Sequence, residues 1–263
     1  MGEYSKTEVE GRLLIVTINR PEVYNALHPM ANQELSDIFD GFHDNPELWV
    51  AIITGAGDKA FSAGNDLKYH AEYRKKTGRT PAHPRRRMGG LASRFDLDKP
   101  VIAAVNGVAM GGGFEIALAC DIIVASDRAT FALPEPKVGL AAGSGGMQRL
   151  SRMIPLKKAM GMLLTGRHVS AQEGSDLGFV TEVVPHAELM KAARRWASDI
   201  LACSPMSVRA TKQVVMRSLD TPALETAMHK LDYPAFVAMT GSEDTVEGPR
   251  AFAEKRKPDW KGR

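Results

Sequence analysis

Two glutamates lie beside apolar segments, where a carboxylate can serve as an acid or a base. Glu115 directly precedes the apolar residues 116–119. Glu135 follows residues 131–133 and stands between two prolines. Burial beside apolar side chains raises a carboxyl pKa towards neutrality, which suits proton transfer near pH 7. The two residues are therefore candidates for a paired acid and base around a substrate, and surface carboxylates are the alternative.

Three consecutive glycines, residues 111–113, come directly before a segment with the pattern of a helix. Glycines at this position leave the backbone N–H groups uncrowded at the positive end of the helix dipole. Such donors stabilise an oxyanion that develops on a carbonyl group. Gly112 is the expected donor, although a lone glycine run is more often only a flexible turn.

A glycine-rich turn at residues 55–60 matches the pattern G-x-G-x-x-A of dinucleotide-binding proteins. That motif requires a helix directly after the turn and an acidic residue at the distance that reads the ribose. Residues 61–66 continue to turn instead, and the acidic residue is missing. Ordinary turn chemistry is the better interpretation, and a nicotinamide cofactor is not expected.

Ser144 lies in a segment, residues 142–146, that differs by one residue from the G-x-S-x-G nucleophile elbow. A hydrolase is therefore a second enzymatic hypothesis, with His168, His186 or His229 as the base. The elbow needs a preceding strand, and residues 134–142 contain two prolines, a lysine and a glycine. A glycine-rich loop that enters a helix explains the segment better.

The composition is that of an ordinary globular protein. The 263 residues are 44% hydrophobic and 25% charged. Lys and Arg exceed Asp and Glu by only 34 to 31, so a nucleic acid partner is not predicted. Cys120 and Cys203 are isolated, so neither a disulfide framework nor a metal site is expected. Because no run of 18 apolar residues and no apolar leader occurs, we expect no membrane partner and a cytoplasmic location.

Continuous apolar runs between helical patterns predict an α/β protein with a parallel sheet covered by helices. Strands are predicted over residues 13–18, 50–54, 101–105, 122–125 and 180–184. Helices are predicted over residues 29–42, 114–119, 148–154, 187–201, 207–218, 222–239 and 242–255. Residues 69–90 are basic and rich in turn formers, which predicts a loop. We expect a core domain over residues 1–200 and a C-terminal helical region over residues 201–263.

Ordered motifs along almost the whole chain resemble the enoyl-CoA hydratase/isomerase, or crotonase, superfamily. The motifs are N-R-P, N-A-L, A-G-x-D-L, K-P-V-I-A-A-V-N-G, G-G-M-Q-R-L and A-F-A-E-K-R, at residues 19–21, 25–27, 63–67, 99–107, 145–150 and 251–256. The resemblance implies a spiral of ββα units with a C-terminal helical trimerisation region. It also implies a homotrimer or a hexamer built as a dimer of trimers.

The resemblance also assigns a substrate and roles. Family members hold the carbonyl of a coenzyme A (CoA) thioester between two backbone N–H groups, which here fall on Asn65 and Gly112. The two glutamates of the hydratase branch fall on Glu115, which would activate water, and Glu135, which would exchange the proton at the α carbon. Retention of both favours hydration or dehydration over isomerisation, decarboxylation or thioester hydrolysis, with no metal and no prosthetic group.

The expected contacts with CoA follow from the same resemblance. They fall on Ala26, Ala63, Asp66, Leu67, Lys68, Phe252 and Lys255, the last two supplied by a neighbouring subunit. For the arginine run at residues 85–87 a solvated loop is the first interpretation and a phosphate contact the second. A non-catalytic RNA-binding or scaffold protein of the same fold is the remaining alternative, and loss of the glutamates with a broad basic face would favour it.

Within the superfamily, residues 131–135 and 247–263 look most similar to carnitinyl-CoA dehydratases. A carnitinyl chain carries a quaternary ammonium, which binds aromatic faces or a carboxylate. Tyr69, Tyr73 and Phe95 are the candidate aromatic partners. Asn65 differs both from the small residue of ordinary hydratases and from the larger aromatic residue of the carnitinyl branch, so the acyl group stays open at this point.

Overall fold

The computed structural model describes residues 2–82, 84 and 88–263. The arginine run at residues 85–87 lies outside these residues. Most of the core is a six-stranded sheet with the order β1 (Ser5–Glu10), β2 (Leu13–Ile18), β3 (Val50–Gly55), β5 (Val101–Val105), β7 (Ile122–Ser126) and β10 (Glu182–Val184). All of its strand pairs are parallel except β1 with β2. The predicted α/β class with a parallel sheet is therefore confirmed.

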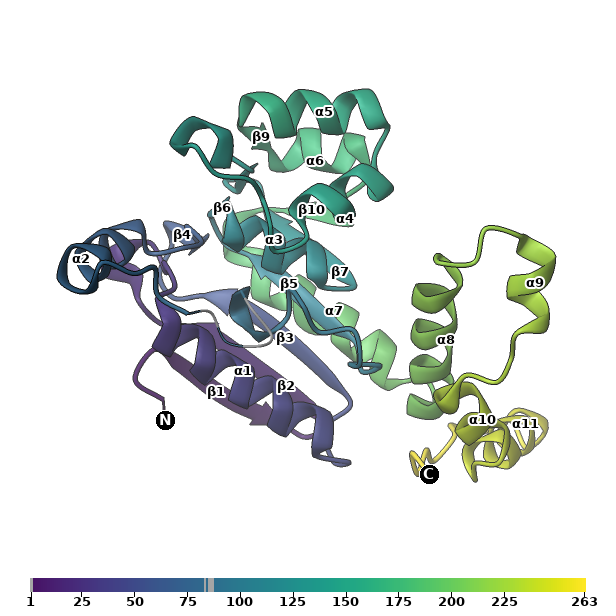
Figure 1. The fold of residues 1–263 in the computed structure, drawn as a ribbon. Helices are drawn as coiled ribbons and strands as arrows, with labels where there is room; N and C mark the ends of the chain where they lie inside the picture. The colour runs from purple at the N-terminus through teal and green to yellow at the C-terminus, as the bar shows by residue number, and fades with distance from the viewer. Residues whose placement is uncertain (1, 83, 85–87) are drawn as a thin grey trace.

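A second, smaller sheet lies beside the first (Figure 1). Its order is β4 (Ala60–Ser62), β6 (Val108–Met110), β8 (Thr130–Ala132) and β9 (Val169–Ser170). The pairs β4–β6 and β6–β8 are parallel, and β9 is antiparallel to β8. Each of β4, β6 and β8 follows a strand of the large sheet along the chain, and a helix comes after it. The chain thus repeats a ββα unit.

Helices cover both faces of the large sheet (Figure 1). On one face α1 (Pro29–Asp44) buries Leu35, Phe39 and Phe42 in the main core. On the other face α7 (Leu189–Leu201) buries its alanine-rich side against alternate residues of the same strands. Because side chains alternate across a strand, this two-sided burial explains why the runs are continuously apolar.

The remaining helices pack at the edges of these layers. In chain order they are η1 (Pro21–Val23), α2 (Leu67–Thr77), η2 (Met88–Gly90), α3 (Gly112–Ala119), η3 (Glu135–Val138), α4 (Gly146–Met153), α5 (Leu156–Thr165), α6 (Ala171–Leu177) and η4 (His186–Glu188). The helices α8 (Pro205–Ser218), α9 (Leu224–His229), α10 (Pro234–Thr240) and α11 (Asp244–Ala253) form a group to one side of the sheet (Figure 1). In the part of the chain that the structure describes, no helix is both long and apolar enough to span a bilayer.

Two predicted elements are wrong. The predicted loop at residues 69–90 contains most of α2, which Asp66 caps by accepting a hydrogen bond from the Tyr69 N–H at 3.0 Å. None of the α2 residues is buried, so no apolar stripe reveals this helix. The predicted helix at residues 222–239 is broken into α9 and α10, because Pro234 begins a new helix and residues 230–233 are extended or turned.

Lys99 ties the end of α1 to the sheet. Its ammonium is buried and donates to the carbonyl oxygens of Phe42 at 2.7 Å and Asn45 at 2.6 Å. Burial lowers the pKa of Lys99 to about 8, and the positive charge of Arg209 acts in the same direction. These two hydrogen bonds satisfy carbonyl groups at the end of α1 that have no partner within the helix.

We predict that Lys99 makes stability depend on alkaline pH. Between pH 8 and roughly 10.4, the ordinary pKa of lysine, the unfolded chain keeps a proton that the folded chain has lost. The free energy of unfolding should therefore gain up to about 1.4 kcal/mol per pH unit from this group. Urea unfolding across this range should show a steeper rise for the native chain than for Lys99→Met. Parallel pH profiles of the two proteins would contradict the prediction.

Candidate active site

The site is built where three parallel strands of the small sheet end. Asn65 comes three residues after β4, Gly112 two residues after β6, and Glu135 three residues after β8. Parallel neighbours bring their carboxyl ends to the same edge of a sheet. The topology therefore collects these three residues, which are far apart in the sequence, at one edge.

The backbone around Asn65 is fixed by a short parallel bridge to Leu27. The Leu27 N–H donates to the Gly64 carbonyl at 2.7 Å, and the Asp66 N–H donates to the Leu27 carbonyl at 3.1 Å. Because peptide groups alternate in direction along an extended segment, the Asn65 N–H faces away from Leu27. Gly64 lies against Gly112: a Cβ atom on Gly64 would be 2.5 Å from the Gly112 nitrogen.

The glycine run makes this close approach possible. Gly111 has φ 53° and ψ −122°, a conformation that L side chains rarely adopt. A Cβ atom on Gly113 would lie 2.0 Å from the Ser62 carbonyl oxygen. Within residues 2–82, 84 and 88–263, the N–H groups of Asn65 and Gly112 have no hydrogen-bond acceptor. Two unused donors thus lie close together at the N-terminus of α3.

Glu115 lies in the first turn of α3 and is 2% exposed. Its Oε1 atom accepts hydrogen bonds from the backbone N–H groups of Ser144 at 2.7 Å and Gly146 at 2.9 Å. Burial raises the pKa of Glu115, and these two hydrogen bonds only partly oppose that increase. The carboxyl group is therefore fixed in orientation through one oxygen.

Glu135 begins η3 and reaches back towards α3. Its Oε1 atom lies 3.1 Å from the position that a Cβ atom on Gly111 would occupy. Its Oε2 atom is buried and has no hydrogen-bond partner among the described residues. Burial raises the pKa of Glu135, and repulsion by Glu115 raises it further. The two carboxyl groups therefore share one weakly solvated site, where proton transfer near neutral pH is accessible.

The structure does not support two alternative interpretations of the sequence, a dinucleotide-binding turn at residues 55–60 and a nucleophile elbow at Ser144. The turn at residues 55–60 leads into β4 rather than a helix, and the side-chain amides of Asn25 and Asn106 hold it by binding its carbonyl oxygens. Ser144 follows no strand, and its N–H group binds Glu115. The candidate base His186 contacts Ser126 at 3.1 Å rather than Ser144. Neither a dinucleotide turn nor a nucleophile elbow is present.

The structure places the expected CoA-binding residues in two groups. Ala26, Ala63, Asp66, Leu67 and Lys68 surround the bridge between Leu27 and Asn65 and the start of α2. The Asp66 carboxylate is already used, because it caps α2 and pairs with Arg20 at 3.0 Å. Burial alone would raise the pKa of Asp66, but these contacts hold it below its ordinary value.

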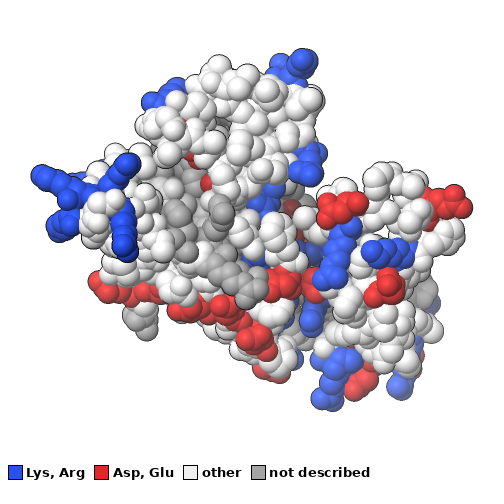
Figure 2. Space-filling model, in the orientation of Figure 1, with Lys and Arg blue, Asp and Glu red and all other residues white. Residues whose placement is uncertain are grey.

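A cationic surface adjoins this first group. Figure 2 shows Lys and Arg side chains gathered at the left, where Figure 1 places α2. Its exposed members are Lys68, Arg74, Lys75 and Lys76. Sequence reasoning assigned the last three to a loop, whereas the helix fixes their spacing. Phosphate groups of a ligand that extends from the strand ends would meet a favourable potential here.

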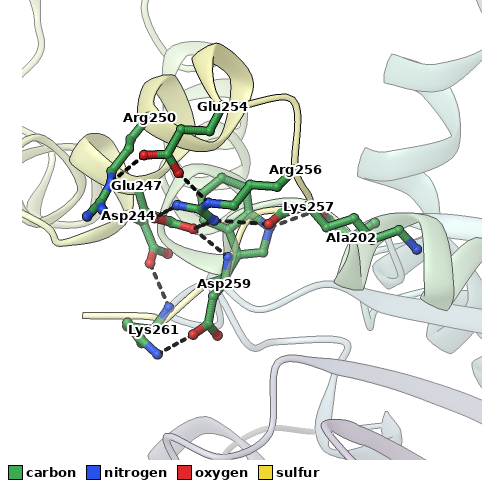
Figure 3. A network of polar contacts seen from close by, with 10 residues as sticks. Ala202, Asp244, Glu247, Arg250, Glu254, Arg256, Lys257, Asp259 and Lys261 are labelled. Atoms are coloured by element: carbon green, nitrogen blue, oxygen red, sulfur yellow. Dashed lines mark hydrogen bonds and ion pairs between the residues drawn. The ribbon is translucent and has the colours of Figure 1, made fainter.

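The second group lies in the C-terminal region, away from the strand ends (Figure 1). Phe252 is 87% exposed, and Lys255 has a positive φ of 54° just after α11. Arg256 pairs with Glu247 at 2.6 Å, and the Lys261 N–H binds Asp244 at 2.8 Å, which fixes the terminal segment (Figure 3). One chain does not bring Phe252 and Lys255 to the strand-end site.

The candidate partners of a quaternary ammonium are also separated. Tyr69 and Tyr73 stack on α2 with ring centroids 6.2 Å apart. The Arg149 guanidinium lies 5.8 Å from the centroid of Phe95. A second cation at that ring would be repelled, so Phe95 is a poor partner. Across the described ranges, no group of three or more His, Cys, Asp and Glu residues has a metal-binding arrangement.

Sequence reasoning missed the groups that hold Glu115. These groups are the backbone N–H groups of Ser144 and Gly146. Residue types do not identify a backbone donor, although the glycines around these two residues indicate a tight loop. It also missed Gly64, whose φ of 79° and contact with Gly112 let the two N–H groups approach.

Comparison with known proteins gives consistent results. The sequence model of the Enoyl-CoA hydratase/isomerase family matches residues 8–263. Carnitinyl-CoA dehydratases from Escherichia coli and Citrobacter koseri are each 45% identical over 260 residues, which covers 96% of both chains. The crystal structure of enoyl-CoA hydratase from Mycobacterium tuberculosis has a TM-score of 0.91 at 37% identity, with 100% of both chains covered. That from Bacillus anthracis has a TM-score of 0.89 at 33% identity, with 99% of this chain and 100% of that chain covered.

We predict that Gly113→Ala destabilises the protein by about 1–3 kcal/mol, the usual cost of overpacking a core. The added methyl group would collide with the Ser62 carbonyl oxygen, which the backbone of β4 holds in place. Gly41→Ala is the matched control, because Gly41 also lies in a helix and has open space around it. This control should stabilise the protein by up to about 1 kcal/mol. Equal urea midpoints for the two variants would refute the close approach of α3 to β4.

Proposed function

The chain belongs to the enoyl-CoA hydratase/isomerase family, and from that premise we propose that it adds water to, or removes water from, the α,β bond of a CoA thioester. The observation that carries the proposal is a pair of carboxyl groups, the buried Glu115 and the partly buried Glu135, beside two backbone N–H groups that have no acceptor among the described residues. The family names and the names of the relatives support the same reaction class.

The N–H groups of Asn65 and Gly112 hold the thioester carbonyl oxygen in this mechanism. Negative charge develops on that oxygen when the α carbon gains or loses a proton. The Gly112 donor also lies at the positive end of the α3 dipole. Donors that are already oriented stabilise the enolate without reorganisation, which lowers the barrier.

The two glutamates divide the proton transfers. In hydration, the free oxygen of Glu115 takes a proton from water, which attacks the β carbon, and Glu135 delivers a proton to the α carbon. In dehydration the roles reverse: Glu135 removes the α proton and Glu115 protonates the departing hydroxyl. The orientation of Glu115 is fixed by Ser144 and Gly146, so its free oxygen presents water in one position. The reaction as written uses no prosthetic group and no metal.

We further propose that the ligand crosses between subunits. Ala26, Ala63, Leu67 and Lys68 contact the CoA moiety in one chain. Phe252 and Lys255 of a neighbouring subunit complete the phosphate end. The exposure of Phe252 and the rigid terminal segment that holds Lys255 support this arrangement. It requires a homotrimer or a hexamer, which sedimentation of the full chain would test. We expect the enzyme to act in the cytoplasm.

The acyl chain is proposed from the relatives. The 45% identity to carnitinyl-CoA dehydratases favours a carnitinyl or crotonobetainyl chain over a plain fatty acyl chain. The deciding experiment is a panel of enoyl-CoA and 3-hydroxyacyl-CoA thioesters that includes crotonobetainyl-CoA, followed through the absorbance of the conjugated thioester. Turnover of crotonobetainyl-CoA above that of crotonyl-CoA supports the finer proposal. No change of absorbance with any thioester would overturn the reaction class.

We predict that Glu115→Gln and Glu135→Gln each reduce kcat by about 10²–10⁴, the usual contribution of general acid or base catalysis. The amide keeps the size of the side chain but cannot exchange the proton. Affinity for the CoA thioester should stay within a few-fold, as isothermal titration would show. Glu173→Gln is a control, because this carboxylate only pairs with Arg167 away from the site. Near-native kcat in either site variant contradicts its assignment.

We predict that Gly112→Pro lowers kcat by at least about 10²-fold, because it removes one oxyanion donor. Proline is tolerated at the first position of a helix, so the fold should survive. Gly112→Ala keeps the N–H group, and the three atoms nearest to its Cβ all belong to the Met88 side chain, which must shift, so the loss of kcat should be much smaller. Asn65→Ala also keeps its N–H and should mainly alter substrate preference. If Asn65→Ala reduces kcat as much as Gly112→Pro, the Asn65 side chain participates directly.

A further inference from the structure

The orientation of Glu115 depends on one short loop. This loop, residues 143–146, supplies both N–H groups that bind Oε1 of Glu115. At its centre Gly145 has φ 103° and ψ −1°, which only glycine adopts readily. The loop contains no helix or strand before α4 begins at Gly146. A side chain that packs against this loop therefore helps to hold the conformation that fixes Glu115.

Arg149, from the first turn of α4, lies across this loop. Its Nη1 atom is 3.5 Å from the Ser144 carbonyl oxygen. A Cβ atom on Gly145 would lie 2.1 Å from Nη1 and 3.3 Å from Cζ of the guanidinium. The Phe95 ring lies 5.8 Å from Cζ. The guanidinium is thus packed against the backbone that carries the two N–H groups.

The charge of Arg149 is not neutralised by a direct contact. In the ranges that the structure describes, no carboxylate lies within ion-pair distance of this side chain. Burial lowers the pKa of Arg149, and the charge of Glu115 opposes that effect. An arginine remains protonated even so, because its ordinary pKa exceeds 12. A half-buried cation therefore acts on Glu115 across a weakly solvated space.

Among the described residues, Arg149 supplies the positive charge that acts on Glu115, whereas the other titratable groups nearby do not. Glu135 from η3 offers no positive charge, and burial and the charge of Glu115 both raise the pKa of its carboxyl group. Cys120, at the end of α3, is kept neutral because burial raises the pKa of its thiol. The hydrogen bonds from Gly146 and Ser144 lower the pKa of Glu115, and the positive charge of Arg149 lowers it further.

We propose that Arg149 is a positioning residue for Glu115: it holds the 143–146 loop and places a positive charge near the carboxyl group that accepts a proton from water. This role rests on the proposed hydration or dehydration reaction. Arg149 does not touch the reacting atoms. It acts through the loop and through its charge.

The first test uses the charge. Arg149→Gln should raise the pKa of Glu115 by about one pH unit, the lower end for loss of a nearby opposite charge. Infrared difference spectra of the substrate-free protein, with Glu115→Gln as the reference, follow this carboxyl group directly. The acidic limb of the kcat profile for hydration should move upward by the same amount. Arg152→Gln is the matched control, because Arg152 is an exposed residue of the same helix.

The second test keeps the positive charge and changes the shape of the side chain. Arg149→Lys keeps the charge but cannot cover Gly145 with a planar group. It should leave the carboxyl titration near that of the native chain and reduce kcat by about tenfold, with KM changed less than twofold, as expected for mispositioning. This variant decides the question if Arg149→Gln does not fold.

The outcomes separate the two proposals. An unchanged Glu115 titration in folded Arg149→Gln, or native kcat in Arg149→Lys, overturns the role of Arg149. Absence of turnover by the native chain on every thioester overturns the proposed function, and the infrared titration still measures whether Arg149 sets the protonation of Glu115.

Discussion

The parallel pairing of three very short strands is the constraint on which the site depends. The strands β4, β6 and β8 have three residues each, and each follows a strand of the large sheet in the chain. Their parallel register places Asn65, Gly112 and Glu135 at one edge. A strand in the opposite direction would move its functional residue to the other edge of the sheet. The ββα repeat thus brings two backbone N–H groups and a carboxyl group together.

The glycines follow from this constraint. Successive units pack so closely that a Cβ atom on Gly64 would lie 2.5 Å from the Gly112 nitrogen. That distance leaves no space for a methyl group between Gly64 and Gly112 or between Gly113 and Ser62. The glycine run is therefore more than a flexible turn. Its members serve different purposes, because Gly111 supplies an unusual backbone conformation, Gly112 a donor and Gly113 a close contact.

The parts of the fold that sequence reasoning predicted are those encoded locally. Apolar runs indicated the long strands of the large sheet, and the glycine run and Glu135 stood out by residue type. The strands β4, β6 and β8 are too short for a periodic pattern. Helix α2 has no buried residue, so its capping by Asp66 and Gly78 was the main local signal. The support of Glu115 by Ser144, Gly146 and Arg149 comes from tertiary packing, which no local pattern contains.

The electrostatics of the two glutamates explain how one site can serve both directions of a reaction. Burial raises the pKa of both carboxyl groups, and the charge of Glu115 raises the pKa of Glu135 further. Such a pair titrates as a unit and holds one proton most readily. Because Glu115 has two N–H donors and a nearby guanidinium, whereas Glu135 Oε2 has no partner among the described residues, the shared proton favours Glu135. In the proposed reaction this asymmetry suits Glu115 to act as the base at the water position and Glu135 as the acid at the α carbon during hydration, and the two roles reverse in dehydration.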